Sequence, residues 1–360
     1  MYLALLASAL LVGSLLAVQA SVNQQLNKAV GTPYGASTVQ LTVAAGALAV
    51  LATAVGAIGA VALVPEVHPW WLLLGGMASP LYITAGILLF PRLGALTAVG
   101  LFVTGQVFAS LCLDLLGLLA VPQKSLSIGI VLGALAVLLG ITVVVRGQRQ
   151  AQRVGEPGVA TRSAPTAGSG RDVGPGTATP SLTVPAPGRD VGPGTATSTL
   201  PAAPPGRSTP QSGWLALGIL AGAVLPIQGA INARLKSEIA RPLAVGTISF
   251  VVATLTIATL LIVLLALRRT PTPRLRTLRE MPWWGWLGGF CAAAYVIATF
   301  LFIPKIGAAT TVAFTVTGQQ LASALIDHFG LFRMPRRPLN VPRIGGLALL
   351  IVGSVLIHLV

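Results

Sequence analysis

The chain has 360 residues, of which 54% are hydrophobic and only 9% are charged, and its mean hydropathy is +0.84. Soluble globular proteins carry about 25% charged residues, so this composition excludes an ordinary soluble domain and indicates that the main partner of the chain is a lipid bilayer. The formal net charge of +15 does not indicate nucleic-acid binding, because no basic stripe with interleaved aromatic residues accompanies it.

Ten long apolar runs follow one another along the chain. A helix that crosses the hydrocarbon core needs about 20 mostly apolar residues, and the runs approach or exceed that length. Helices are expected rather than barrel strands, because each segment must satisfy its own backbone hydrogen bonds in lipid and the runs do not alternate polar with apolar residues. The sequence therefore predicts an all-α integral membrane protein with ten transmembrane helices. Their expected bounds are about 3–26, 36–64, 70–90, 94–120, 126–146, 214–234, 243–267, 283–303, 308–332 and 343–360.

A polar stretch separates the runs into two sets of five. Residues 147–212 are rich in Pro, Gly, Thr, Ser and Ala, and they contain GRDVGPGTAT twice, at 170–179 and 188–197. Such a segment cannot bury enough apolar surface to offset the entropy lost on ordering. We expect a disordered linker that joins two five-helix domains, 1–146 and 213–360.

The two sets of runs are internal repeats of each other. One constant offset relates Gln19 to Gln228, Asn23 to Asn232 and Pro33 to Pro242. A second constant offset relates Trp70 to Trp283, Gly75 to Gly288, Gly76 to Gly289, Tyr82 to Tyr295, Pro91 to Pro304, Gly105 to Gly318, Gln106 to Gln319, Asp114 to Asp327 and Gly140 to Gly353. A fixed spacing through so many Gly, Pro, Trp and polar positions indicates a duplication.

The odd number of helices in each repeat predicts how the repeats are related. A five-helix repeat starts on one face of the membrane and ends on the other, so the second repeat is inverted with respect to the first. Inverted repeats are an architecture of secondary transporters, in which two opposed halves rock around a shared central site.

The distribution of Lys and Arg among the loops predicts the orientation, because cytoplasmic loops carry the excess of basic residues. We expect the more basic face and the linker to be cytoplasmic and both termini to lie outside. The more basic face carries Lys28, Arg92, Arg146, Arg149, Arg153, Arg268, Arg269, Arg274, Arg276, Arg279, Arg333, Arg336, Arg337 and Arg343. The other face carries Lys124, Arg234, Lys236, Arg241 and Lys305.

The first apolar run also resembles a signal peptide, with small residues near Ala20 and Ser21 where a peptidase would cut. A signal peptide needs a basic segment before its apolar run, whereas the first basic residue here is Lys28. The matching run lies in the middle of the chain, where no signal peptidase acts. We therefore expect a transmembrane helix at this position in each repeat.

Six amide side chains inside the expected helices are candidates for a substrate cavity. Intramembrane polar groups tend to face a bundle interior or cavity, but they can equally serve as hydrogen-bond glue between helices. Both interpretations stay open for the glutamines, and the structural one is favoured for the two asparagines because they lie near helix ends. The candidates are Gln19, Asn23, Gln106, Gln228, Asn232 and Gln319.

Two acidic residues inside the membrane, Asp114 and Asp327, are candidates for a gate or a proton site. They can alternatively cap a loop or pair with nearby basic residues, such as Arg333 and Arg336 for Asp327. No hydrolase elbow, zinc motif or P-loop is present in the sequence, so catalysis, a cofactor and direct ATP use are not expected.

These motifs together resemble a known family. The elements Q-x3-N, WW-x3-GG, P-[RK]-x-G and GQ-x7-D-x2-G, and the stretches QGAINARL and GQQLASALIDHFGL of the second half, resemble the YdcZ-type (DUF606) branch of the drug/metabolite transporter superfamily. The resemblance covers both repeats and leaves out the linker.

The resemblance implies a multi-pass protein of the bacterial cytoplasmic (inner) membrane that transports a small molecule, without implying which one. Two fused repeats imply a monomer that acts as a pseudo-dimer. Small multidrug exporters of the superfamily use a glutamate in their first helix, but residues 1–27 contain no acid, which argues against cation/proton antiport by that mechanism. A lipid or lipid-carrier flippase and a non-transporting membrane subunit remain the alternatives.

Overall fold

The computed structural model describes residues 2–121, 123, 125–155 and 211–359. Within these ranges the fold is all-helical, as expected. The α-helices are α1 Tyr2–Val30, α2 Pro33–Ala54, α3 Ala78–Leu93, α4 Ala95–Leu116, α5 Ile128–Gly155, α6 Gln211–Ile239, α7 Pro242–Ala266, α8 Leu287–Ile306, α9 Ala308–Phe329 and α10 Val341–Leu359. Short 3-10 segments join them: η1 Ile58–Glu66, η2 Trp70–Met77, η3 Leu118–Ala120, η4 Arg276–Glu280, η5 Trp283–Trp286 and η6 Leu331–Arg333.

Several expected spans differ from the observed helices in their ends. The run 36–64 is α2 followed by η1, because the chain turns at Gly56, whose φ of +68° is a conformation that glycine adopts readily. The tryptophan-rich segments that precede α3 and α8 are 3-10 rather than α-helical. α5 continues to Gly155, past the expected end at 146. Most of the expected linker, 156–210, lies outside the described residues.

Seven of the described segments are long and apolar enough to cross a membrane: α1, α2, α4, α6 and α7, and α3 and α8 together with the 3-10 turns before them. α5 and α10 contain shorter apolar stretches, Ile128–Val144 and Val341–Leu356. α9 belongs to neither group. It carries Gln319 and Gln320 side by side as well as several threonines, and these polar residues lower its hydropathy.

The helices that correspond in the two repeats run antiparallel. In the α4–α9 pair, the amide of Leu96 meets Asp327 while Gln106 meets Gln319, so one helix ascends as the other descends. The α5–α10 pair shows the same order, because Gly140 lies against Gly346 and Gly133 against Gly353. This arrangement is the inverted relation that the odd helix number predicts.

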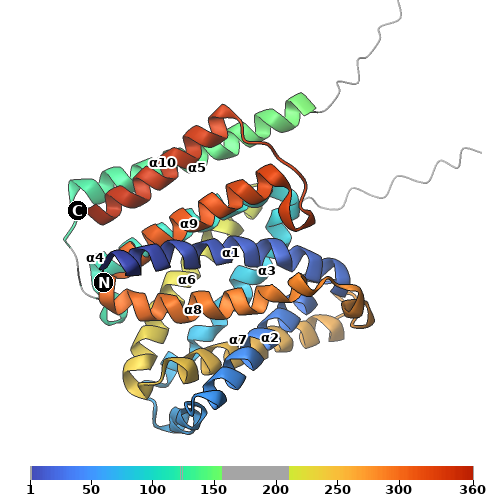
Figure 1. Cartoon of the computed structure of the whole chain (residues 1–360), viewed down its shortest axis with the longest axis vertical. Coiled ribbons are helices and arrows are strands. Elements are labelled where there is room, and N and C mark those ends of the chain that lie inside the picture. Colours follow the sequence, from blue (N-terminus) through green and yellow to red (C-terminus); the bar gives the residue numbers. More distant parts are fainter. Residues whose placement is uncertain (1, 122, 124, 156–210, 360) are drawn as a thin grey trace, which may run out of the picture. The chain divides into compact units, whose positions relative to one another are not determined.

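Contacts between the repeats build the core. α1 of the first repeat packs on α8 and α9 of the second, and α6 of the second packs on α3 and α4 of the first (Figure 1). Two of the close approaches are also equivalent: a methyl group on Gly13 would overlap the carbonyl of Thr315, and one on Gly222 would overlap the carbonyl of Phe102. Glycines here let two backbones touch, as is common between membrane helices.

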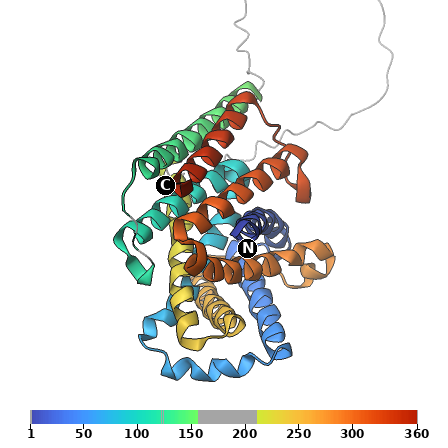
Figure 2. The same ribbon diagram turned by 60° about the vertical axis from the view of Figure 1, so that its left-hand side comes forward.

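The last helices of the two repeats, α5 and α10, lie side by side, as Figures 1 and 2 both show. A methyl group on Gly140 or Gly353 would press against the carbonyl of Gly346 or Gly133, respectively. The regular spacing of these glycines in the sequence therefore marks a close helix crossing.

Large apolar side chains are exposed along the outer faces of several helices. Examples are Leu132 and Leu139 on α5 and Leu255 and Ile262 on α7, each between 53% and 64% exposed. Exposed apolar surface of this extent is uncommon on soluble monomers. It suits contact with lipid and fits a multi-pass membrane protein.

Candidate functional site

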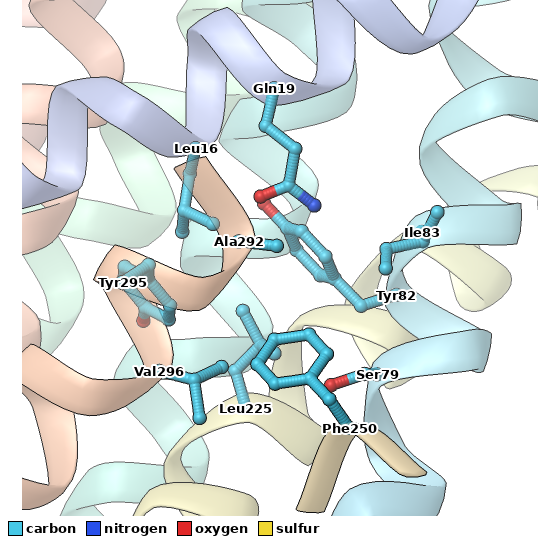
Figure 3. Close-up of a pocket in the computed structure, with 10 residues that line it drawn as sticks. All are labelled: Leu16, Gln19, Ser79, Tyr82, Ile83, Leu225, Phe250, Ala292, Tyr295 and Val296. Carbon is cyan, nitrogen blue, oxygen red and sulfur yellow. The ribbon is translucent and has the colours of Figure 1, made fainter. Parts of the chain in front are cut away.

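A small cavity lies between the two repeats. Its volume is about 10 Å³, and side chains converge on it from α1, α3, α6, α7 and α8 (Figure 3). A cavity of this volume holds about one water and lies far below the roughly 300–1,000 Å³ of ordinary ligand pockets, so it would have to widen around any substrate. Since every lining residue is buried, the cavity is closed to both faces. The lining residues are Leu16, Gln19, Ser79, Tyr82, Ile83, Leu225, Phe250, Ala292, Tyr295 and Val296.

Most of the lining consists of residues that correspond in the two repeats. The two offsets pair Leu16 with Leu225, Ser79 with Ala292, Tyr82 with Tyr295 and Ile83 with Val296. The cavity therefore lies on the pseudo-twofold axis that relates the two inverted repeats, and inverted-repeat transporters bind their substrates at such a position.

The pair Ser79 and Ala292 breaks this symmetry. Gln228 Nε2 donates to the Ser79 hydroxyl at 2.8 Å, and the same hydroxyl lies 3.0 Å from Gln228 Oε1, to which it can donate in turn. The corresponding glutamine, Gln19, faces Ala292, which has no hydroxyl (Figure 3). Gln19 Oε1 is buried and has no hydrogen-bond donor among the described residues. One repeat thus satisfies its cavity amide, and the other leaves its amide oxygen open.

The two glutamines expected at the bilayer midplane lie at the crossing of α4 and α9. Gln106 Nε2 donates to Gln319 Oε1 at 3.4 Å, and Gln319 Nε2 donates to the Tyr82 hydroxyl at 2.8 Å. Both glutamines are 0% exposed. Neither borders the cavity itself, but Tyr82 does, so Gln319 is linked to the cavity through Tyr82 and Gln106 only through Gln319.

The two asparagines tie helices together near the ends of α1 and α6. Asn23 Nδ2 donates to Gln40 Oε1 at 2.6 Å, and Asn232 Nδ2 donates to the Ser249 hydroxyl at 3.0 Å. Neither asparagine lines the cavity, and each forms a hydrogen bond that holds two helices together. A contact of either residue with a substrate stays a prediction.

Asp327 forms a buried ion pair. Arg343 Nη2 lies 2.7 Å from Asp327 Oδ2, and the two side chains are 3% and 2% exposed. The backbone amide of Leu96, in the first repeat, donates to the same carboxylate oxygen at 3.2 Å. The partner is thus neither Arg333 nor Arg336, because the backbone that follows α9 turns back and brings the first turn of α10 beside the carboxylate.

Arg343 therefore does not contribute a loop charge. It also donates from Nη1 to the carbonyls of Arg337 and Pro338, at 2.8 and 3.0 Å, and so fastens the segment between α9 and α10. Asp114, the counterpart of Asp327, is buried in α4. Ile130 occupies the position that corresponds to Arg343, so the two repeats do not form this ion pair from corresponding residues. A gate or proton role for either aspartate stays a prediction.

Sequence reasoning did not single out several residues of this site. Tyr82 and Tyr295 recur at the repeat offset, and that recurrence inside an apolar run is the signal that marks them. Ser79 and Phe250 carry no such signal, because their counterparts are Ala292 and Leu41. A residue that differs between the repeats can be interpreted only when the side chains that contact it are known.

A second, larger hollow opens on the outside of α2 and α8. Its empty volume is about 1130 Å³, and its lining includes Gly46, Leu51, Phe290 and Ala293. All eleven lining residues are glycine or apolar. We call this hollow the lateral groove. It suits a lipid chain, but it offers no polar side chain to a headgroup.

The described residues contain no group of three or more His, Cys, Asp or Glu side chains that suits a metal ion. Of the two cysteines, Cys291 is buried and Cys112 is exposed. The polar chemistry at the cavity thus comes from amides and hydroxyls. Such groups bind and orient a molecule through hydrogen bonds.

Comparison with known proteins identifies the family. The DMT_YdcZ family model, described as "Putative inner membrane exporter, YdcZ", matches residues 4–143 and 213–356. A comparison with curated proteins gives no match. The two matched regions fall on the two repeats and together cover most of the chain, and the description supports a multi-pass inner-membrane transporter in general terms. The chain therefore belongs to the DMT_YdcZ family, of which it carries two fused copies.

Proposed function

We propose that the protein is a secondary transporter that carries a small, uncharged molecule across the cytoplasmic membrane by alternating access. The observation that supports this most directly is the closed cavity on the axis between the inverted repeats, with one unsatisfied amide oxygen in its wall. The two repeats, 1–146 and 213–360, act as the opposed halves of one molecule, and the segment 147–212 connects them.

The expected orientation is part of the proposal: basic loops and linker in the cytoplasm, both termini outside. Contacts among the basic loops support a common face. The amide of Arg274 donates to the carbonyl of Val30 at 2.9 Å, and Gln25 donates to the carbonyl of Phe332 at 2.9 Å. The loops before η4 and after α9 therefore gather at the end of α1 that carries Lys28. An excess of basic residues at one end is typical of the cytoplasmic side.

The Asp327–Arg343 ion pair suits a gate at that same end. The ion pair joins α9 to α10, and the Leu96 amide of α4 donates to the same carboxylate, so separation of α4 from α9 would break that hydrogen bond and leave the buried carboxylate with one donor fewer. A buried ion pair is costly to separate because each charge would remain desolvated. Opening of the cytoplasmic side would therefore require a rearrangement of this cluster.

The lateral groove gives some support to a second candidate, a lipid flippase. A flippase must pass a polar headgroup across the membrane, however, and the groove is lined only by glycine and apolar residues. The polar groups lie at the central cavity instead. We therefore favour transport of a small molecule through the centre, with lipid chains resting in the groove. A non-transporting subunit would need no central cavity.

Access to the cavity from each face tests the proposal. Leu16 and its counterpart Leu225 both line the cavity, so Leu16→Cys and Leu225→Cys are made singly in a background that carries Cys112→Ser and Cys291→Ala. We expect a membrane-impermeant maleimide to label each introduced thiol slowly when added to either side of proteoliposomes of uniform orientation, because the two open states alternate.

The substitution Leu51→Cys in the same background provides the matched control. Leu51 faces the lateral groove, so a thiol at this position should stay unlabelled from both sides. If neither the Leu16→Cys nor the Leu225→Cys variant reacts from either face under conditions that label an exposed loop cysteine, the chain is not a transporter with a central path.

A further inference from the structure

We infer that the protein binds one anionic phospholipid at the start of α2. The lipid phosphate lies against arginines of the segment that connects α7 to η5, residues 267–282, which we call the basic connection. One acyl chain of the lipid lies along α2. This site is separate from the central cavity and does not depend on the transport proposal.

A second hollow continues the lateral groove toward the start of α2. Its volume is about 430 Å³, within the roughly 300–1,000 Å³ of ordinary ligand pockets. The two hollows meet at Val43, which lines both. On α2 the second hollow extends from Gly35 to Val43, which is about 12 Å at 1.5 Å per residue. One leaflet provides about half of the roughly 30 Å hydrocarbon thickness, so this length suits one acyl chain.

The second hollow has an apolar wall and ends at the basic connection. Thr38 and Thr42 line it, but their hydroxyls donate to the carbonyls of Tyr34 and Thr38, each at 2.8 Å. These hydroxyls are therefore satisfied within α2 and do not require a polar ligand. A tryptophan at the end of the hollow suits the level of the lipid headgroups. The residues at that end are Pro273, Leu275 and Trp286.

The basic connection carries five arginines and a single acid, Glu280. All five arginines are exposed, and none of them forms an ion pair within the described part of the chain. A guanidinium group binds phosphate well, because its planar N–H groups match the phosphate oxygens. The excess of positive charge favours a headgroup with a net negative charge over a zwitterionic one. The arginines are Arg268, Arg269, Arg274, Arg276 and Arg279.

The basic connection is fixed against the start of α2. The amide of Arg274 donates to the carbonyl of Val30 at 2.9 Å, and the hydroxyls of Thr32 and Thr270 lie 2.9 Å apart. A methyl group on Gly31 would meet Nη2 of Arg274 at 2.7 Å, so this guanidinium lies at the turn between α1 and α2. The positive charge and the apolar hollow are therefore held next to each other, as a ligand with a charged head and an apolar chain requires.

Only one repeat supplies this charge. The corresponding connection of the first repeat, residues 55–69, contains no Lys or Arg. The anionic lipid is therefore expected at the end of the molecule that carries Lys28, and not at the opposite end.

Binding of defined lipids tests the site. We expect native mass spectrometry of the delipidated full-length protein in detergent to show that dioleoylphosphatidylglycerol binds about tenfold more tightly than dioleoylphosphatidylcholine, which corresponds to about 1.4 kcal/mol. The two lipids have the same chains and differ in headgroup charge. Equal affinity for the two lipids would overturn the inference. Displacement of the phosphatidylglycerol by an equal concentration of inorganic phosphate would also overturn it, because the chain would then contribute nothing.

A pair of double variants separates a built site from general attraction to positive charge. Arg274→Gln with Arg276→Gln should lower the phosphatidylglycerol affinity about tenfold, to that of phosphatidylcholine. Arg146→Gln with Arg336→Gln removes the same number of charges from exposed residues outside the hollow and should bind like wild type. An equal loss of affinity in both double variants would mean that the lipid responds only to overall charge, and the site would be wrong.

The acyl chain has its own test. Thr42 is exposed and lines the hollow, so Thr42→Trp fills the hollow without entering the core and should weaken binding of both lipids about tenfold. Leu255→Trp, on the outer face of α7 where Leu255 is 61% exposed, is the matched control and should bind like wild type. Equal unfolding temperatures of the two variants would show that the fold is intact. Unchanged phosphatidylglycerol affinity in Thr42→Trp would overturn the inference.

Discussion

The two repeats share a backbone arrangement but differ in how they satisfy their buried polar groups. Gln228 is paired with Ser79, whereas the corresponding Gln19 faces Ala292. Asp327 is paired with Arg343, whereas the repeat of Asp114 has an isoleucine where the arginine would stand. The second repeat thus pairs Asp327 with an arginine of its own, and the first repeat presents an open amide oxygen at the cavity. The duplicated backbone is similar in the two repeats, and single residue differences, Ser79 against Ala292 and Arg343 against Ile130, account for these differences in bonding.

The largest expected effect comes from the ion pair. Asp327→Ala leaves the Arg343 guanidinium buried without its counter-charge and should lower the free energy of unfolding by about 3–5 kcal/mol. Thermal unfolding in detergent measures this loss. Replacement of both Asp327 and Arg343 by leucine is the control and should recover most of the loss, since an apolar pair avoids the desolvation cost.

The close backbone contacts should respond equally in the two repeats. Gly13→Ala and Gly222→Ala each place a methyl group into a carbonyl of the facing helix and should each destabilise the fold by about 1–3 kcal/mol. Gly46→Ala, which has nothing within 4 Å of the added group, is the control and should be harmless. A markedly unequal response of Gly13 and Gly222 to the change would argue that the repeats are not structurally equivalent at this contact.

The midplane glutamines should have a modest effect on stability and a large one on transport. Gln319→Leu removes the bonds to Gln106 and to Tyr82 and should cost about 1 kcal/mol in unfolding free energy. The protein should still insert into the membrane, but the introduced thiol of Leu16→Cys should lose its reactivity from at least one face. Gln106→Leu removes one bond and should cost less. Unchanged two-sided labelling in the double glutamine variant would rule out a role for this pair in the substrate path.

The smallest effects should have opposite signs at one pair of corresponding positions. Ser79→Ala removes the partner of Gln228 and should lower the unfolding free energy by about 0.5 kcal/mol. Ala292→Ser gives Gln19 a partner and should raise it by a similar amount. Denaturation of both variants beside wild type measures the two signs. Loss of stability in both would mean that the serine cannot reach Gln19.

Much of the fold followed from local chemistry. Long apolar runs give helices in lipid because each helix satisfies its own backbone, and the constant offset of Gln, Trp and Gly positions indicated the duplication. The family resemblance and the all-helical fold are confirmed. Helix ends were less certain, as at α2 and η1, because a 3-10 segment is as apolar as the α-helix before it.

The candidate site was only partly visible in the sequence. Of the six amides, Gln19 lines the cavity, Gln228 and Gln319 reach it through Ser79 and Tyr82, and the others bond elsewhere. An amide can recur in both repeats because it contacts a ligand or because it forms a hydrogen bond between helices. The residue type and the spacing alone do not distinguish these two roles. The partner of Asp327 was misjudged for a related reason, because Arg343 is farther along the chain than Arg333 and Arg336 and comes beside Asp327 only when the segment after α9 folds back.

The sequence by itself determined the helices, their number in each repeat and the inverted relation between the repeats. These depend on hydropathy and spacing, which act along the chain. The tertiary structure alone decided that Gln19 Oε1, at the cavity, has no hydrogen-bond donor among the described residues while Gln228 has a partner. That depends on Ser79 and Gln228, which are 149 residues apart, and on Gln19 and Ala292, which meet only when the two repeats pack together. Satisfaction of a buried polar group is a property of its neighbours in space.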